Sequence, residues 1–162
     1  MTDAKVFTAT RAEIDQCVSL LALAFSTDPA ARWVYKDPHA YTEHFPRFIR
    51  AFGCAAFDYD TAHHVDGCAT ALWIPPGEAP SEDALGAVIE VSIPRAEQAL
   101  VFELFEEMGR NHPDEPHWYC RSSARTQRSR AGVTARLYSS MRWRCAMCRR
   151  CGPISKRPAR ET

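Results

Sequence analysis

The distribution of charge along the chain constrains its fold more than any other feature. The 162 residues carry 20 basic and 20 acidic side chains, so the formal net charge is zero. Up to Tyr119 there are 8 lysines and arginines against 19 acidic residues, a net charge of −11. From Cys120 onward there are 12 against one, a net charge of +11. The chain therefore divides into two unlike parts between these residues.

The basic part, residues 120–162, lacks the side chains that build a hydrophobic core. Its only leucine, isoleucine, valine or phenylalanine residues are Val133, Leu137 and Ile154. A segment so poor in these residues and so rich in charge does not offset the conformational entropy lost on folding. We therefore expect residues 120–162 to be a disordered tail and residues 1–119 to belong to one packed domain.

Composition and cysteine usage favour a cytoplasmic protein. No apolar run approaches the ~20 residues of a membrane-spanning helix, and no signal peptide opens the chain. The seven cysteines are an odd number without the spacing of a disulfide framework, which is typical of a reducing compartment. We expect a cytoplasmic location and no membrane partner.

Hydrophobic periodicity predicts a strand and two helices in the first half of the acidic part. Residues 6–8 form the strand, and Thr10 with Glu13 forms a capping box for a helix that ends at Asp28-Pro29. This helix has one apolar stripe: Ile14, Val18, Leu21 and Phe25. A second helix carries aromatic residues over positions 41–52, where Pro46 predicts a kink or restart.

The rest of the acidic part predicts a hairpin, two helices and a final strand. Asp66-Gly67 lies between two apolar runs, and this dipeptide favours a two-residue type I′ turn. Ser81 caps the next helix, Pro94 interrupts it, and Gly109 is the expected C-terminal cap of the helix that follows. His117-Trp118-Tyr119 begins a strand. The resulting α/β order stops in the middle of that strand.

Three segments carry a resemblance to a known family. The capped first helix runs into Ala24-Phe25, Asp28-Pro29 and Trp33. The second hairpin strand reads Ala-Leu-Trp-Ile-Pro-Pro-Gly over residues 71–77, and Glu-Pro-His-Trp-Tyr precedes the last strand at residues 115–119. In this order and spacing they resemble one bacterial branch of the GNAT superfamily, the acyl-CoA-dependent N-acyltransferases.

The resemblance implies an α/β fold with a GNAT-like mixed sheet and flanking helices. It implies that an amine, on a small molecule or a peptide, attacks the thioester of acetyl-CoA while a general base takes its proton. It places Trp33 and Tyr35 at the acceptor pocket, and His117 and Tyr119 at the start of the strand that flanks the acetyl group. Ordinary packing of the two aromatic residues and a surface position for His117 remain alternatives. No residue is assigned as the catalytic base.

The chain departs from this family where the coenzyme A site belongs. In the family the strand continues as Leu-x-x-Ile-Gly-Val-x-Pro, and a Gln-x-x-Gly-x-Gly loop then leads into a helix whose free amides hold the pyrophosphate. Here Tyr119 is followed by Cys-Arg-Ser-Ser and an arginine-rich run that contains only Gly132 and Gly152. We therefore expect the second half of the fold to be missing and acetyl transfer to be impaired.

A shifted reading frame would explain the departure. Alternative codons, built from the wobble base of one residue and the first two bases of the next, permit Pro-Leu-Ile-Gly across residues 120–124. They also permit glycines at alternate positions across residues 130–135. The crowding of arginine, serine, cysteine and tryptophan is typical of a GC-rich gene read out of frame. A sequencing error and a wrong gene model are alternative origins of the same change.

The basic tail supports a rival interpretation. Its eleven arginines, with Tyr138 and Trp143 interleaved, would bind nucleic acid without sequence preference. A preference for one sequence or RNA shape would distinguish a selected nucleic-acid binder from an unselected polycation. A dimerisation or regulatory module that kept the first half of the fold is a third possibility.

Two motifs suggest a metal site, but neither has the required geometry. His63 and His64 are neighbours on a strand and point to opposite faces, so we expect one in solvent and one half-buried. Cys145, Cys148 and Cys151 lack a nearby fourth ligand, because the tail has no histidine and Cys120 is distant in sequence. We expect no metal.

Overall fold

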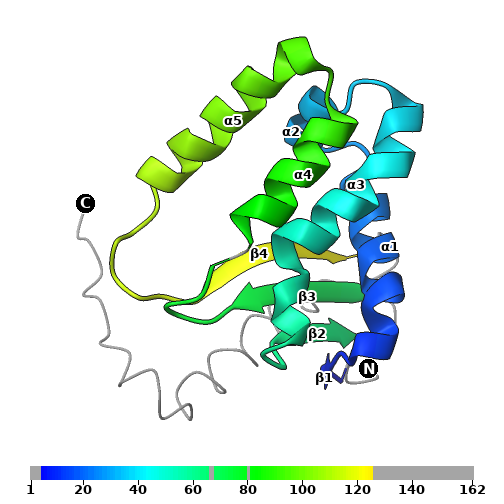
Figure 1. The fold of residues 1–162 in the computed structure, drawn as a ribbon. Coiled ribbons are helices and arrows are strands. Elements are labelled where there is room, and N and C mark those ends of the chain that lie inside the picture. Colours follow the sequence, from blue (N-terminus) through cyan, green and yellow to red (C-terminus); the bar gives the residue numbers. More distant parts are fainter. Residues whose placement is uncertain (1–4, 66–67, 80, 126–162) are drawn as a thin grey trace, which may run out of the picture.

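Four strands form one antiparallel sheet in the computed structural model, which describes residues 5–65, 68–79 and 81–125. The strands are β1 (Phe7–Thr8), β2 (Ala62–Val65), β3 (Ala69–Ile74) and β4 (Tyr119–Arg125), and they lie side by side in this order (Figure 1). All three pairings among the described strands are antiparallel. The predicted α/β class is therefore confirmed for these residues, but they do not form the predicted mixed sheet, which needs a parallel pair.

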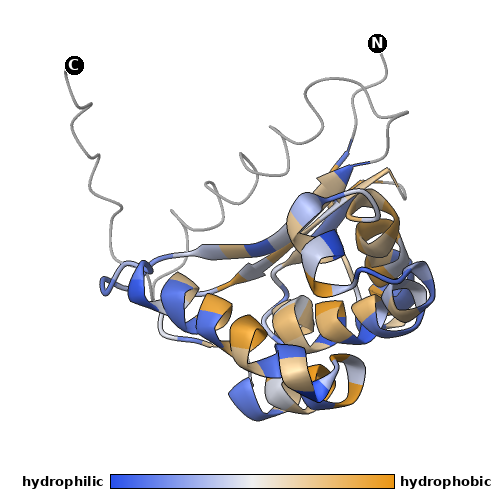
Figure 2. Ribbon diagram, turned by 90° about the horizontal axis from the view of Figure 1, so that it is seen from above, coloured by the Kyte–Doolittle hydropathy of each residue, from blue (hydrophilic) through white to orange (hydrophobic). Residues whose placement is uncertain are grey.

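Two groups of helices connect the strands. Helices α1 (Ile14–Ala24), α2 (Pro29–Val34) and α3 (Pro38–Gly53) lie between β1 and β2 in sequence. Helices α4 (Glu82–Ser92) and α5 (Arg95–Arg110) lie between β3 and β4. The helices gather on one side of the sheet, where α1 and α3 contact the strands and α4 packs against α3 (Figures 1 and 2). None of the described helices combines the length and apolarity that crossing a membrane requires.

Side-chain caps define where several of these helices begin. The Glu13 carboxylate accepts a hydrogen bond at 2.8 Å from the backbone N–H of Thr10, as the predicted capping box requires, and a further one at 2.8 Å from the Thr10 hydroxyl. Asp28, Asp37 and Ser81 each accept a bond from the N–H three residues further along. The cap predicted at Ser81 is thus confirmed, and Asp28 begins α2 directly after the first helix.

The helix restart predicted as one possibility at Pro46 and the C-terminal cap predicted at Gly109 are wrong, whereas the interruption predicted at Pro94 is confirmed, because α4 ends at Ser92 and α5 begins at Arg95. Helix α3 continues through Pro46, because its aromatic face remains packed on both sides of that residue and compensates for one missing hydrogen bond. Helix α5 continues past Gly109 to Arg110. The side chain of Asn111, rather than a glycine, ends it by donating to the Glu107 carbonyl at 2.8 Å.

Strand β4 continues across the compositional boundary between Tyr119 and Cys120. Residues up to Arg125 pair with β3, so the disorder predicted from residue 120 onward is wrong for Cys120–Arg125. Strand pairing uses backbone groups, and the small side chains of Ser122, Ser123 and Ala124 fit beside β3 without a hydrophobic pattern. The rest of the predicted tail, including the three-cysteine motif, lies outside the described residues, and so does the predicted turn at Asp66-Gly67.

The main hydrophobic core lies between the sheet and the helices. Val18 and Leu21 of α1 and Ile49 of α3 pack in one cluster with Leu72 and Ile74 of β3. A smaller cluster, centred on Val65, Ala69 and Ala71, is formed without a residue from the described helices. Strand β3 therefore contributes apolar side chains to both faces of the sheet, with Leu72 and Ile74 in the main cluster and Ala69 and Ala71 in the smaller one.

The two adjacent histidines of β2 are both shielded from solvent. Their cross-strand partners, Ala71 for His63 and Thr70 for His64, show that they point to opposite faces, as predicted. His63 is only 2% exposed, while His64 lies 3.2 Å from a Glu13 carboxylate oxygen and against the Phe7 ring. The expectation that one of them faces solvent is wrong, because both faces of this strand are covered.

A candidate ligand pocket

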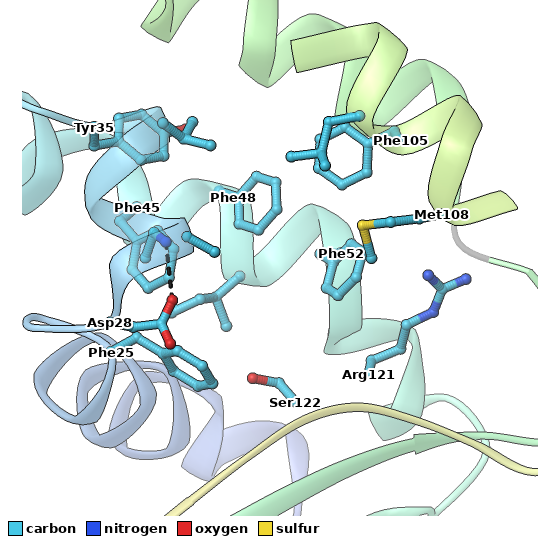
Figure 3. Close-up of a pocket in the computed structure, with 15 residues that line it drawn as sticks. Phe25, Asp28, Tyr35, Phe45, Phe48, Phe52, Phe105, Met108, Arg121 and Ser122 are labelled. Atoms are coloured by element: carbon cyan, nitrogen blue, oxygen red, sulfur yellow. Dashed lines mark hydrogen bonds between the residues drawn. The ribbon is translucent and has the colours of Figure 1, made fainter. Parts of the chain in front are cut away.

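An aromatic cavity of about 240 Å³ lies between α2, α3, α5 and β4 (Figure 3). Six aromatic side chains line it: Phe25, Tyr35, Phe45, Phe48, Phe52 and Phe105. Its few polar groups come from Asp28, Tyr35, Arg121 and Ser122. The volume is slightly below the ~300 Å³ at which pockets for drug-sized ligands begin, so the cavity suits a small, mainly apolar molecule.

The aromatic wall follows from the sequence of α3. Phe45, Phe48 and Phe52 are spaced by three and four residues, which places them on one face of the helix. Their rings stack in succession, with centroids 5.8 Å apart for the first pair and 5.3 Å for the second. Phe105 of α5 meets the middle ring at 6.0 Å. The two helices therefore hold a continuous aromatic surface that faces the cavity.

Asp28 supplies the carboxylate at one end of this pocket. It follows α1 and caps α2, where one of its oxygens accepts a hydrogen bond from the Ala31 N–H at 2.9 Å. A second, more open depression of about 460 Å³ adjoins the cavity and shares Phe25 and Asp28 with it. The far side of this depression is formed by residues 123–125 of β4. Asp28 thus lies where the aromatic cavity meets a more open surface.

Arg121 lies toward the other end of the pocket, under the end of α5 (Figure 3). The β3–β4 register shifts between Leu72 and Trp73, whose partners are Ser122 and Cys120, so Arg121 is the extra residue of a bulge. Such a bulge redirects a side chain. The guanidinium carbon lies 4.8 Å from the centroid of the Phe52 ring and 4.5 Å from that of Tyr119. Burial lowers the pKa of Arg121, and the nearby Tyr119 acts in the opposite direction.

Of the four residues that the resemblance implicates, Tyr35 lines the cavity and Tyr119 touches one of its lining residues. Tyr35 is 2% exposed, and its hydroxyl lies 3.0 Å from the Ser92 hydroxyl of α4. Burial raises the pKa of Tyr35, which keeps this phenol neutral. Tyr119 contacts Arg121 through the ring–guanidinium contact described above. The structure does not bring the four residues together in one site.

The other two implicated residues lie outside the cavity wall. Trp33 of α2 is 47% exposed and is not among the residues that line the pocket. The ring of His117 lies against that of His112 in a tilted arrangement, with centroids 4.6 Å apart, and its Nδ1 lies 2.7 Å from the Glu115 carbonyl oxygen. It therefore belongs to the loop before β4, partly buried, rather than to the pocket.

Sequence reasoning missed the roles of Asp28 and Arg121. Asp28-Pro29 was recognised as a helix boundary, and its role as the cap of α2 could have been read from the following proline. No local signal identifies Arg121, because the bulge that directs its side chain depends on pairing with a strand almost fifty residues earlier. The role of Asp28 could therefore be predicted from the neighbouring sequence, whereas that of Arg121 could not.

The described part of the chain shows no group of metal-ligating side chains and no activated thiol at Cys17 or Cys54. Within residues 5–125, apart from the short gaps, no three histidine, cysteine or acidic side chains gather as a metal site would require. Burial raises the pKa of Cys17, and it raises that of Cys54 to about 11. Neither thiol is therefore activated as a nucleophile at neutral pH.

Comparison with protein-family models and with curated proteins gives no match for this chain. An apolar cavity with a carboxylate toward one end and a guanidinium toward the other can bind and orient a small molecule that carries a polar group on an apolar body.

Proposed function

We propose that this chain is a GNAT-like protein that keeps the acceptor side of an N-acetyltransferase and lacks its acyl-CoA site. One observation carries the proposal. The resemblance assigns the acceptor to the segment after the first helix and the acetyl group to the last strand. In the structure, six residues of the segment 25–35 line the same cavity as Arg121 and Ser122 of β4; the six are Phe25, Asp28, Ala30, Ala31, Val34 and Tyr35. This proximity of two segments far apart in sequence supports the proposal that an acceptor is held between them.

The pocket is suited to an amine with an apolar body. The body would fill the space beside Phe45 and Phe48, and an ammonium group could pair with the Asp28 carboxylate at the open side. For transfer, the neutral amine nitrogen would form a bond to the acetyl carbon as the carbon–sulfur bond breaks and coenzyme A leaves as a thiolate. A base must take one amine proton, and we assign no residue to that role.

The acyl-CoA site is the part that this sequence does not supply. Binding a pyrophosphate requires backbone amides that approach it closely, which glycines at the start of a helix permit. Beyond β4 the sequence contains only Gly132 and Gly152, separated by nineteen residues. We therefore propose that the chain recognises an amine but transfers acetyl groups poorly or not at all. The thiols of Cys17, Cys54 and Cys68, which form no disulfide, suit a reducing compartment such as the cytoplasm.

The gene itself offers the sharpest test of this proposal. We expect the nucleotide sequence around codon 120 to contain an open alternative frame that encodes a glycine-rich loop. A protein re-encoded in that frame from codon 120 should release free thiol from acetyl-CoA in the presence of an arylalkylamine. The chain as it stands is the matched control and should remain at background. A closed alternative frame, or equal thiol release by both proteins, would contradict the proposal.

A further inference from the structure

The guanidinium of Arg121 is a partly buried positive charge without a counter-ion in the described part of the chain. No described carboxylate forms an ion pair with it. Its Nε atom is buried and has no hydrogen-bond acceptor among the residues that the structure describes. Removing such a group from water costs free energy unless a partner restores its hydrogen bonds. An anion placed beside Arg121 would provide that partner.

The surroundings of Arg121 define what else such an anion must carry. The rings of Phe52 and Tyr119 contact the guanidinium and hold its orientation. Phe105 and Met108 of α5 line the same cavity (Figure 3). A hydrated inorganic ion would leave this apolar surface unfilled, whereas a molecule with an apolar body would fill it. The cavity volume of about 240 Å³ limits that body to roughly a ring or a short chain.

We propose that this pocket binds a small carboxylic acid, with its carboxylate on Arg121 and its apolar body against the rings of Phe48, Phe52 and Phe105. The planar guanidinium offers parallel N–H donors that match a carboxylate, and the low polarity of the cavity strengthens the pair. This binding requires no acyl transfer, so it extends beyond the proposed function and stands even if the chain transfers no acetyl group.

Matched acids and amides test the proposal on the full chain. Calorimetric titrations would compare 3-phenylpropionate with 3-phenylpropionamide, and octanoate with octanamide. Each amide keeps the body of its acid and lacks the charge. At least one acid should bind tenfold or more tightly than its amide, since a hydrogen bond to a charged group is worth about that factor. The acid that binds more tightly identifies whether the pocket takes a ring or a chain.

The Arg121→Met variant tests whether the preference for acid over amide depends on Arg121, and the Arg110→Met variant is its control. Arg110 is exposed at the end of α5 and pairs with Glu107, so its replacement also removes one positive charge. Arg121→Met should bind acid and amide equally, and Arg110→Met should keep the preference of the unaltered chain. If Arg121→Met does not fold, the Arg121 Nε–H resonance of the unaltered chain should shift with the acid and not with the amide. The proposal would be overturned if the unaltered chain bound acid and amide equally, or if it bound neither acid at about 10 mM. It would also be overturned if Arg121→Met kept the preference for the acid.

Discussion

Tyr41 shows how the environment of one residue in the aromatic core sets a property that can be measured. Its ring stacks on Phe45 at 4.6 Å, and its hydroxyl donates to the Ala22 carbonyl at 2.6 Å. Burial raises the pKa of Tyr41 to about 12, while Arg32 partly opposes and Asp28 adds to this shift. The pKa of the Tyr41 phenol is therefore about two units higher in the folded protein than its ordinary value of 10. Between these two pH values the phenol is neutral in the folded protein and ionised in the unfolded chain.

The free energy of unfolding should therefore depend on pH in an alkaline window. Below pH 10 Tyr41 is neutral in both states and contributes no pH dependence. As the pH rises from 10 to about 12, the unfolded chain loses the proton first, so the contribution of Tyr41 to stability is lost across this window. Denaturant unfolding at pH 9 and pH 11 should show a smaller loss for Tyr41→Phe than for the unaltered chain.

Other buried groups also make the free energy of unfolding depend on pH in this alkaline window. The pKa values of Cys17, Cys54 and Tyr35 are also raised by burial, so both proteins lose some stability in alkali. Only the difference between the two proteins reports on Tyr41. If Tyr41→Phe and the unaltered chain lose the same free energy between the two pH values, the Tyr41 phenol is not held neutral by the fold.

At the scale of elements, the close approach of α3 to the sheet depends on Gly53. A Cβ atom at this position would lie 3.0 Å from Cδ1 of Leu72 and 3.6 Å from Cβ of Arg121. Leu72 is completely buried and has little room to move. A methyl group here would press on the same part of β3 and β4 that directs Arg121 into the pocket.

Two glycine substitutions separate this packing effect from the general effect of glycine. Gly53→Ala should lower the free energy of unfolding by about 1–3 kcal/mol through overpacking. Gly86 lies inside α4, where an added Cβ meets nothing within 4 Å. Gly86→Ala should therefore raise the free energy of unfolding by about 0.5–1 kcal/mol. Denaturant unfolding measures both, and stabilisation by Gly53→Ala would show that the contact with Leu72 is not tight.

Elements defined by local chemistry were predictable from the sequence, and elements defined by distant pairing were not. The caps at Glu13 and Ser81 involve residues three apart, so their spacing identifies them. The continuation of α3 through Pro46 depends on packing with other elements, and β4 continues past Tyr119 because β3 offers it backbone partners. The family resemblance implicates Tyr35 in the acceptor pocket, whereas Arg121 reaches the cavity wall only through the pairing of β4 with β3.

At the scale of the whole molecule, the point at which the charge changes sign does not coincide with the end of a strand. The charge changes sign after Tyr119, whereas the sheet continues to Arg125. The first basic residue past the charge boundary, Arg121, is thus part of the cavity wall. A change in the sequence at this point would alter one wall of the pocket as well as the residues that follow. The proposed loss of the acyl-CoA site and the proposed carboxylate site therefore arise at the same position in the chain.

A calorimetric titration of the full chain with acetyl-CoA tests the central claim most directly. The protein must first give a cooperative unfolding transition, so that a missing signal cannot reflect an unfolded sample. We predict no binding heat up to about 1 mM acetyl-CoA, because glycine-flanked amides for the pyrophosphate are lacking in the sequence after β4. A dissociation constant in the micromolar range would contradict the account and show that the chain holds an acyl-CoA site.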